Sequence, residues 1–164
     1  MPEDGGSWRC GAIEEFRTVQ SMTITPVQQW PDTATVEHLA AAFNRSFETC
    51  EDPDDVLSPD VFFDLYPPFW RFQLQGRDAI QAQLRKLNEG SDVTSQILRV
   101  VPTADGFLLE HEETSRGEHT EIARKLWHCV VRNGQIVEAT CYCNGGWDDE
   151  LRARHAAEAP MLRP

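Results

Sequence analysis

Apolar residues recur at helical spacing in the first strongly patterned stretch of the chain. They lie at i, i+3, i+4, i+7 and i+11, on one face of a helix: Val36, Leu39, Ala40, Phe43 and Phe47. Asp32 or Thr33 is suited to accept hydrogen bonds from the free N–H groups of the first turn. The pattern therefore predicts a long amphipathic helix, and Pro53 to Leu57 is expected to form a short second helix.

The middle of the chain combines β-branched and aromatic runs with one further helix. Val61-Phe-Phe-Asp-Leu-Tyr predicts a strand, which Pro67-Pro68 interrupts before a second run over Phe69–Gln75. Gly90 is suited to the left-handed end of the helix that follows. The apolar residues of that helix share one face: Ile80, Leu84 and Leu87.

The last third of the chain reads as a series of strands. We expect them at residues 96–101, 107–114, 118–132 and 135–144, with Asn133-Gly134 as a strong signal for a tight hairpin turn. A short helix over residues 148–158, with Asp148 as its N-cap, is expected to follow. Helices that precede an antiparallel meander indicate an α+β fold, and the lack of strand–helix–strand alternation argues against a Rossmann fold.

Length and charge narrow the class of protein. The 164 residues suit one domain, which we expect over residues 26–164 after a flexible extension over residues 1–25. The net charge of -12 argues against a nucleic-acid partner and against an anionic membrane surface. No apolar run is long enough for a transmembrane helix, and the polar N-terminus lacks the apolar core of a signal peptide. Five cysteines without paired spacing favour free thiols in a cytoplasmic protein.

Several short motifs resemble one superfamily of folds. They are the helix Thr35–Thr49, the run Val61-Phe-Phe-Asp-Leu before Gly76-Arg-Asp-Ala-Ile, the hairpin Val130-Val-Arg-Asn-Gly-Gln-Ile, and the ending Cys141-Tyr-Cys-Asn-Gly-Gly-Trp-Asp. Together they resemble the nuclear transport factor two-like superfamily, and most of all its SnoaL-like, polyketide cyclase-like branch, over roughly residues 32–147.

The resemblance implies a cone-shaped α+β fold, in which a curved antiparallel sheet wraps around a long N-terminal helix in cystatin-like fashion. The superfamily includes ketosteroid isomerases, polyketide cyclases, limonene-type epoxide hydrolases, scytalone-type dehydratases and non-catalytic binding proteins. Asp64 lies within one residue of the position of the ketosteroid isomerase base. Cys141 matches the cyclase acid, and Trp127 matches the cyclase histidine, with His128 one step away.

Four residues are candidates for acid–base catalysis because they bring polar groups into predicted strands: Asp64, Glu110, His128 and Tyr142. Asp64 lies between Phe63 and Leu65, so burial is expected to raise its pKa and make it a general base. Glu110 or His128 is expected to be the second acid or base, and Tyr142 to stabilise oxyanion charge. Each of the four also has a structural interpretation, as a capping, surface or packing residue.

Aromatic and cationic residues near the expected mouth of the cone are the candidates for substrate binding: Trp70, Arg71, Trp127 and Trp147. Two sets of side chains on the strand around residue 127 are alternatives for lining the cavity. Arg124, Leu126 and His128 share one face, while Lys125, Trp127 and Cys129 share the other, and only one set lines the cavity.

No metal and no cofactor are expected, since the possible ligands Glu110, His111 and His119 have no recognised spacing. These patterns lead to the hypothesis of a cofactor-free enzyme of natural-product type metabolism. It would isomerise, cyclise, dehydrate or open an epoxide in a small hydrophobic, oxygenated substrate by acid–base chemistry. The alternative is a non-catalytic small-molecule-binding or dimeric accessory domain of the same fold. A homodimer is expected in either case, because curved sheets of this type often pair through their outer faces.

Overall fold

The computed structural model describes residues 32–159, so the expected extension over residues 1–25 lies outside the described residues. Its elements, in chain order, are α1 (Thr33–Thr49), β1 (Leu57–Tyr66), β2 (Phe72–Gln75), α2 (Arg77–Leu87), β3 (Asp92–Thr103), β4 (Gly106–Arg116), β5 (Thr120–Arg132), β6 (Gln135–Cys143) and α3 (Asp149–Glu158). No helix within residues 32–159 is both long enough and apolar enough to cross a membrane.

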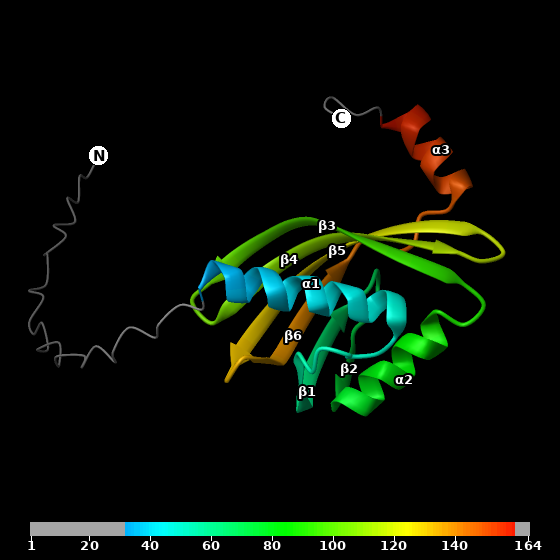
Figure 1. The fold of residues 1–164 in the computed structure, drawn as a ribbon. Coiled ribbons are helices and arrows are strands. Elements are labelled where there is room, and N and C mark those ends of the chain that lie inside the picture. The colour runs from blue at the N-terminus through cyan, green and yellow to red at the C-terminus, as the bar shows by residue number, and fades with distance from the viewer. Residues whose placement is uncertain (1–31, 160–164) are drawn as a thin grey trace, which may run out of the picture.

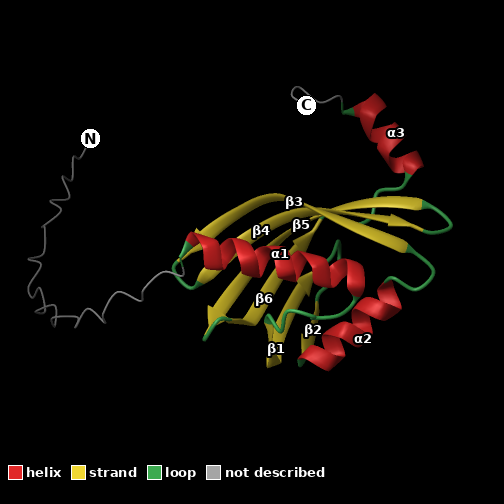
Figure 2. Cartoon of the chain, in the orientation of Figure 1, coloured by secondary structure: helices red, strands yellow, loops and turns green. Residues whose placement is uncertain are grey.

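The strands form one curved, open sheet, and the predicted α+β cone is confirmed. The strand order is β2-β1-β6-β5-β4-β3, and every neighbouring pair is antiparallel except β1 and β6, which run parallel. Helix α1 crosses one face of the sheet, α2 lies beside β1 and β2, and α3 stands apart beyond the sheet (Figures 1 and 2). We call the face under α1 the inner face and the opposite one the outer face.

Helix α1 begins and ends at the residues that local chemistry favours. Of the two candidate N-caps, Asp32 and Thr33, the first is the N-cap, and its side chain accepts a hydrogen bond from the Thr35 backbone N–H at 2.9 Å. The expected short helix over residues 53–57 is wrong. The buried Asp52 carboxylate accepts the backbone N–H groups of Val56 and Leu57, both at 2.9 Å, which holds the segment as a turn, and β1 begins at Leu57.

The other predicted elements are present, but their bounds differ from the prediction: β1, β3 and β4 are longer than expected, whereas β2, β5 and β6 are shorter. Asn133 and Gly134 have φ of 51° and 79°, which forms the tight turn between β5 and β6. Asp148 caps α3 by accepting the Leu151 N–H at 2.8 Å. β3 and β4 gain residues at their ends because pairing with each other, which the residue pattern alone does not show, extends them. β2 begins only at Phe72, because the Trp70 N–H bonds back to the Pro67 carbonyl in a turn.

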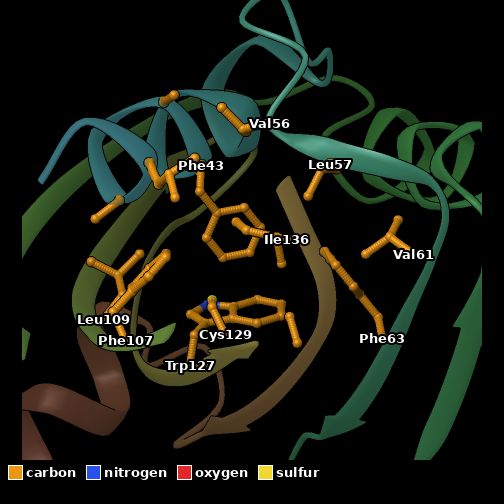
Figure 3. Close-up of a cluster of buried hydrophobic side chains, with 14 of the residues drawn as sticks. Phe43, Val56, Leu57, Val61, Phe63, Phe107, Leu109, Trp127, Cys129 and Ile136 are labelled. Atoms are coloured by element: carbon orange, nitrogen blue, oxygen red, sulfur yellow. The ribbon is translucent and has the colours of Figure 1, made fainter. Parts of the chain in front are cut away.

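A cluster of buried hydrophobic side chains, several of them aromatic, fills the space between α1 and the inner face (Figure 3). The ring of Phe43 meets the rings of Phe63 and Trp127 edge-on, with centroids 5.9 and 5.2 Å apart. Because side chains alternate along a strand, the buried Trp127 and Cys129 place Leu126 and His128 on the outer face. Packing against this core thus fixes which side chains of each strand point into the cone.

Candidate functional site

A pocket of about 290 Å³ opens on the inner face, between the C-terminal end of α1, the C-terminal end of α2 and the β4–β5 arm. We call it the inner pocket. Much of its wall is apolar: Phe47, Pro67, Leu84, Leu87 and Val93. Glu113 of β4 and Lys125 of β5 bring opposite charges to it. A small apolar chamber with a few polar groups is the usual form of a small-molecule site.

Glu113 and Lys125 form a close ion pair in the wall of the inner pocket. Lys125 Nζ donates to Glu113 Oε1 at 2.5 Å, and their side chains are only 20% and 14% exposed, respectively. The same Nζ lies 5.7 Å from the centroid of the Phe47 ring, within range of a cation–π contact. The pair is therefore partly shielded from water and is held on two sides.

A buried polar chain lies next to this pair, deeper under α1. His111 is completely buried, and its Nδ1 lies 2.9 Å from both Asn44 Oδ1 and Ser95 Oγ. Its Nε2 accepts the indole N–H of Trp127 at 3.0 Å. A neutral imidazole that accepts at Nε2 carries its proton on Nδ1, so these partners select one tautomer.

Burial keeps His111 neutral. Desolvation, helped by the positive charge of Lys125, lowers its pKa to about 3. The 3.5 Å approach of His111 Nε2 to Glu113 Oε1 is therefore a contact with a neutral ring and not an ion pair at neutral pH. Lys125 is thus the cation that balances Glu113.

Asp64, the expected general base, lies on the outer face between the inward-facing Phe63 and Leu65. Its carboxylate accepts hydrogen bonds from Arg71 Nε at 2.9 Å and Nη2 at 2.6 Å, and from the Tyr66 hydroxyl at 3.2 Å. The expected rise in its pKa is wrong. The hydrogen bonds from Arg71 outweigh desolvation and lower the pKa of Asp64 below its usual range. A carboxylate held in this way is a weak base at neutral pH.

Glu110 also projects from the outer face, since its neighbours Leu109 and His111 are buried in the cone. Arg124 grips Glu110 Oε1 through Nε at 2.9 Å and Nη2 at 2.8 Å, and Arg99 Nε lies 3.8 Å from Oε2. Glu110 lines an outer-face groove of about 260 Å³.

The metal set of Glu110, His111 and His119 is not assembled, because Glu110 and His111 point to opposite faces. Within residues 32–159, no group of three acidic, His or Cys side chains is placed to hold a metal ion.

His128 and Tyr142 complete the predicted catalytic set, and both lie on the outer face. His128 Nε2 is 3.3 Å from Asp105 Oδ1, while Tyr142 stacks on Tyr66 with ring centroids 5.0 Å apart. His128 is two strands away from Asp64, or about 10 Å at ordinary strand spacing. The structure therefore places all four predicted catalytic residues on one surface but does not bring them together around an enclosed cavity.

The predicted substrate-binding residues are divided between different places. Trp127 is 1% exposed in the core, and Trp70 is 73% exposed beyond β1. Arg71 is occupied by Asp64, as described above. Trp147 pairs with Ile122 through the backbone and lies 5.0 Å, centroid to centroid, from His155 of α3. None of the four lines the inner pocket.

The cysteines in the described part of the chain are free thiols, as expected. Burial raises the pKa of the thiol of Cys141, the residue expected at the acidic position of the cyclases, to about 12. Cys141 is therefore a neutral residue of the core. Cys143 lies two residues further along the same face and borders the inner pocket.

Sequence reasoning missed Glu113, Lys125 and the partners of His111. A signal for Lys125 was present, because it shares a face with Trp127 and Cys129, the most apolar set on its strand. Glu113 is two residues beyond His111 and so shares its face. Neither pattern showed that this face is the inner one.

Comparison with known proteins agrees with this fold. An LEH-like epoxide hydrolase from M. tuberculosis is 17% identical, with a TM-score of 0.59 over 80% of this chain and all (100%) of that one. A protein from Jannaschia sp. CCS1 named as a SnoaL-like polyketide cyclase is 12% identical, with a TM-score of 0.57 over 84% of this chain and 97% of that one. One from Kribbella flavida DSM 17836, named as a ketosteroid isomerase, is 15% identical, with a TM-score of 0.51 over 71% and 82%.

No protein-family model and no curated protein sequence matches the chain. The likeness is thus one of backbone architecture, at identities too low to transfer a reaction. The helix-filled cone, the strand order and these structural neighbours together show that the chain has the nuclear transport factor two-like fold, in the form shared with SnoaL-like and ketosteroid isomerase-like proteins.

Proposed function

We propose that this protein is a cofactor-free enzyme that moves protons on a small, apolar, oxygenated molecule in the inner pocket. Glu113 acts as the acid or base, and Lys125 stabilises its charge and the negative charge that develops on substrate oxygen. The observation that carries the proposal is the partly buried Glu113–Lys125 pair, at 2.5 Å, in the wall of the inner pocket beside the apolar side chains of Phe47, Leu84, Leu87 and Val93. Isomerisation, cyclisation, dehydration and epoxide opening all need a proton donor or acceptor of this kind.

The proposal moves the chemistry away from the outer face. Asp64 and Glu110 are each bound by arginine there, and neither lines the inner pocket. In contrast, Glu113 and its cation, Lys125, both border the inner pocket. A substrate in the inner pocket would therefore meet both members of this pair at once.

The test is a panel of small epoxides, unsaturated ketones and polyketide-like esters, incubated with wild type and paired variants. Glu113→Gln is expected to lower turnover at least about 100-fold, the usual contribution of a general acid or base. Asp64→Asn and Glu110→Gln are the matched amide controls and are expected to leave turnover unchanged. Loss of turnover in either control, with Glu113→Gln active, would return the catalytic site to the outer face.

The rival function is binding without catalysis. It predicts that some compounds of the same panel bind in the inner pocket but are recovered unchanged. Glu113→Gln would then alter the affinity for these compounds, with no turnover to lose. Calorimetric binding followed by mass analysis of the recovered ligand separates the two functions.

We also propose that the protein is a homodimer paired through its outer face. That face exposes Leu126 (41%), Val101 (40%) and Tyr142 (55%) between charged groups that already have partners in the same surface. Charges with partners of their own cost less to bury than free ones.

We also propose a cytoplasmic location, because free buried thiols suit a reducing compartment.

A further inference from the structure

We infer that Lys125 is an amine nucleophile that forms an imine with an aldehyde or ketone held in the inner pocket. The inference deepens the proposed function and rests on it, because it uses Glu113 as the proton carrier. It names carbonyl compounds with an apolar body as the ligand class.

Lys125 is partly buried, whereas the other lysine of the chain is exposed. The sequence contains two lysines, Lys86 and Lys125, against 13 arginines. Lys86 is exposed on the last turn of α2, whereas the Lys125 side chain is 20% exposed and borders the inner pocket. An arginine would hold the carboxylate of Glu113 equally well, but its guanidinium stays protonated and cannot attack a carbonyl.

Glu113 is placed to take the proton that blocks the attack. A lysine must be neutral to act as a nucleophile, and its Nζ already donates to Glu113 Oε1 at 2.5 Å. A ligand that fills the pocket displaces water, which disfavours two separate charges relative to a neutral amine and carboxylic acid. The proton then moves along the existing hydrogen bond.

Other ionisable groups near the pair do not compete for this role. His111 Nε2 accepts from Trp127, and burial keeps the ring neutral. Cys143 borders the pocket, and its sulfur accepts the Gly145 N–H at 3.2 Å. Glu121 adds a second carboxylate at the exposed rim, which favours a neutral ligand over an anion.

The atoms balance without a further reagent. The Nζ lone pair forms a bond to the carbonyl carbon, the carbonyl π electrons move to oxygen, and Glu113 together with the amine supplies the two protons that let oxygen leave as water. The nitrogen keeps one hydrogen, so the product is an iminium, and Glu113 is left as the carboxylate. Glu113 carboxylate can then remove the proton next to the former carbonyl carbon, giving an enamine. The Glu113 carboxylic acid returns that proton to the enamine, on the other face of the same carbon or at the far carbon of a conjugated C=C bond, which restores an iminium. Water then adds to the iminium carbon, Lys125 leaves as the amine, and the isomerised carbonyl compound is released.

The walls indicate the rest of the ligand. The Phe47 ring lies beside Lys125 Nζ, and Leu84, Leu87 and Val93 provide apolar surface in the same chamber. A volume of about 290 Å³ suits one ring or a short branched chain on the carbonyl carbon. A short aromatic aldehyde is therefore an appropriate probe.

The experiment is reductive trapping of the full chain with benzaldehyde and sodium cyanoborohydride at neutral pH. Peptide mapping by mass spectrometry reports benzylation at Lys125, Lys86 and the α-amino group separately over time. We expect Lys125 to be labelled at least about tenfold faster than Lys86 in wild type. We expect Glu113→Gln to remove that advantage, Lys125→Arg to abolish labelling at that position, and Lys86→Arg to leave the rate at Lys125 unchanged.

Each outcome supports or overturns the inference, and the turnover assay tests the proposed function separately. Preferential labelling of Lys125 that depends on Glu113 supports the inference. Labelling of Lys125 no faster than Lys86 overturns it, and the proposed function still stands if Glu113→Gln abolishes turnover of the substrate panel. Preferential labelling that persists in Glu113→Gln removes the proton-carrier role and overturns the inference as stated. The first comparison uses wild type alone, so it does not depend on whether a variant folds.

Discussion

Trp127 donates its indole N–H to His111 Nε2 over 3.0 Å, beneath α1 and away from solvent. This bond explains why a histidine is tolerated in an aromatic core. The ring has one acceptor and one donor when neutral, and Trp127 uses the acceptor while Asn44 and Ser95 surround the donor. A second proton on His111 would place two N–H groups against each other.

His111 should make folding stability depend on pH in a defined window. Its pKa is about 3 in the folded protein and near 6.5 when unfolded, so between these values only the unfolded chain binds the proton. The free energy of unfolding should therefore fall as pH drops below 6.5, by up to about 1.4 kcal/mol per pH unit from this group. Urea unfolding of wild type and His111→Gln from pH 7 to pH 4 measures the difference.

Because carboxylates lose stability in the same direction, the informative quantity is wild type minus His111→Gln. The variant should be less stable at pH 7 by about 1–3 kcal/mol, since a glutamine amide does not meet Trp127, Asn44 and Ser95 together as the ring does, and the gap should narrow at low pH. A gap that is constant from pH 7 to pH 4 would mean that His111 titrates normally in the fold.

The Glu113–Lys125 pair should couple strongly in stability. Lys125→Met leaves a partly buried carboxylate without its cation, and Glu113→Gln leaves the ammonium with a neutral partner. Each single change is expected to cost about 1–3 kcal/mol, while the double variant should cost less than their sum, because it leaves neither charge alone. Additive losses in this thermodynamic cycle would show that solvent already screens the pair.

Gly106 should resist replacement because two backbones approach closely there. A Cβ atom on Gly106 would lie 2.0 Å from the carbonyl oxygen of Cys129 on the neighbouring strand. Gly106→Ala is expected to lower the free energy of unfolding by about 3 kcal/mol through displacement of β4 from β5. Gly90→Ala is the control, since its added methyl meets nothing within 4 Å and only the left-handed backbone, at φ +75°, is strained. Equal losses in the two variants would contradict the close approach.

The outer face should determine the oligomeric state. Leu126→Glu places a charge among the exposed apolar residues of that face and should convert the proposed dimer into a monomer without loss of fold. Leu87→Glu is the matched control, because Leu87 is 62% exposed on α2, at the inner pocket. Light scattering across a concentration series measures both. A monomeric wild type, or dissociation in the Leu87 variant, would refute pairing through the outer face.

Local chemistry was sufficient for most elements. The apolar stripe of α1, the Asp32 and Asp148 caps and the Asn133-Gly134 turn each act within a few residues, so the sequence pattern predicts them directly. The exception was residues 53–57, where Asp52 reaches forward to two backbone N–H groups and replaces the expected helix with a turn. Proline and acidic residues in that segment suit both structures, and the side chain of Asp52 decided between them.

The candidate site shows the opposite situation. Alternation alone separates Lys125, Trp127 and Cys129 from Leu126 and His128, but both sets satisfy the same period of two. Which set faces inward depends on the face that α1 covers, and on register shifts such as that between Val130 and Val131. The α+β elements, and the division of each strand into two sets of side chains, thus follow from the pattern of residues along the chain. Which set is enclosed depends on the packing of α1, because burial under this helix is a contact between segments far apart in the chain.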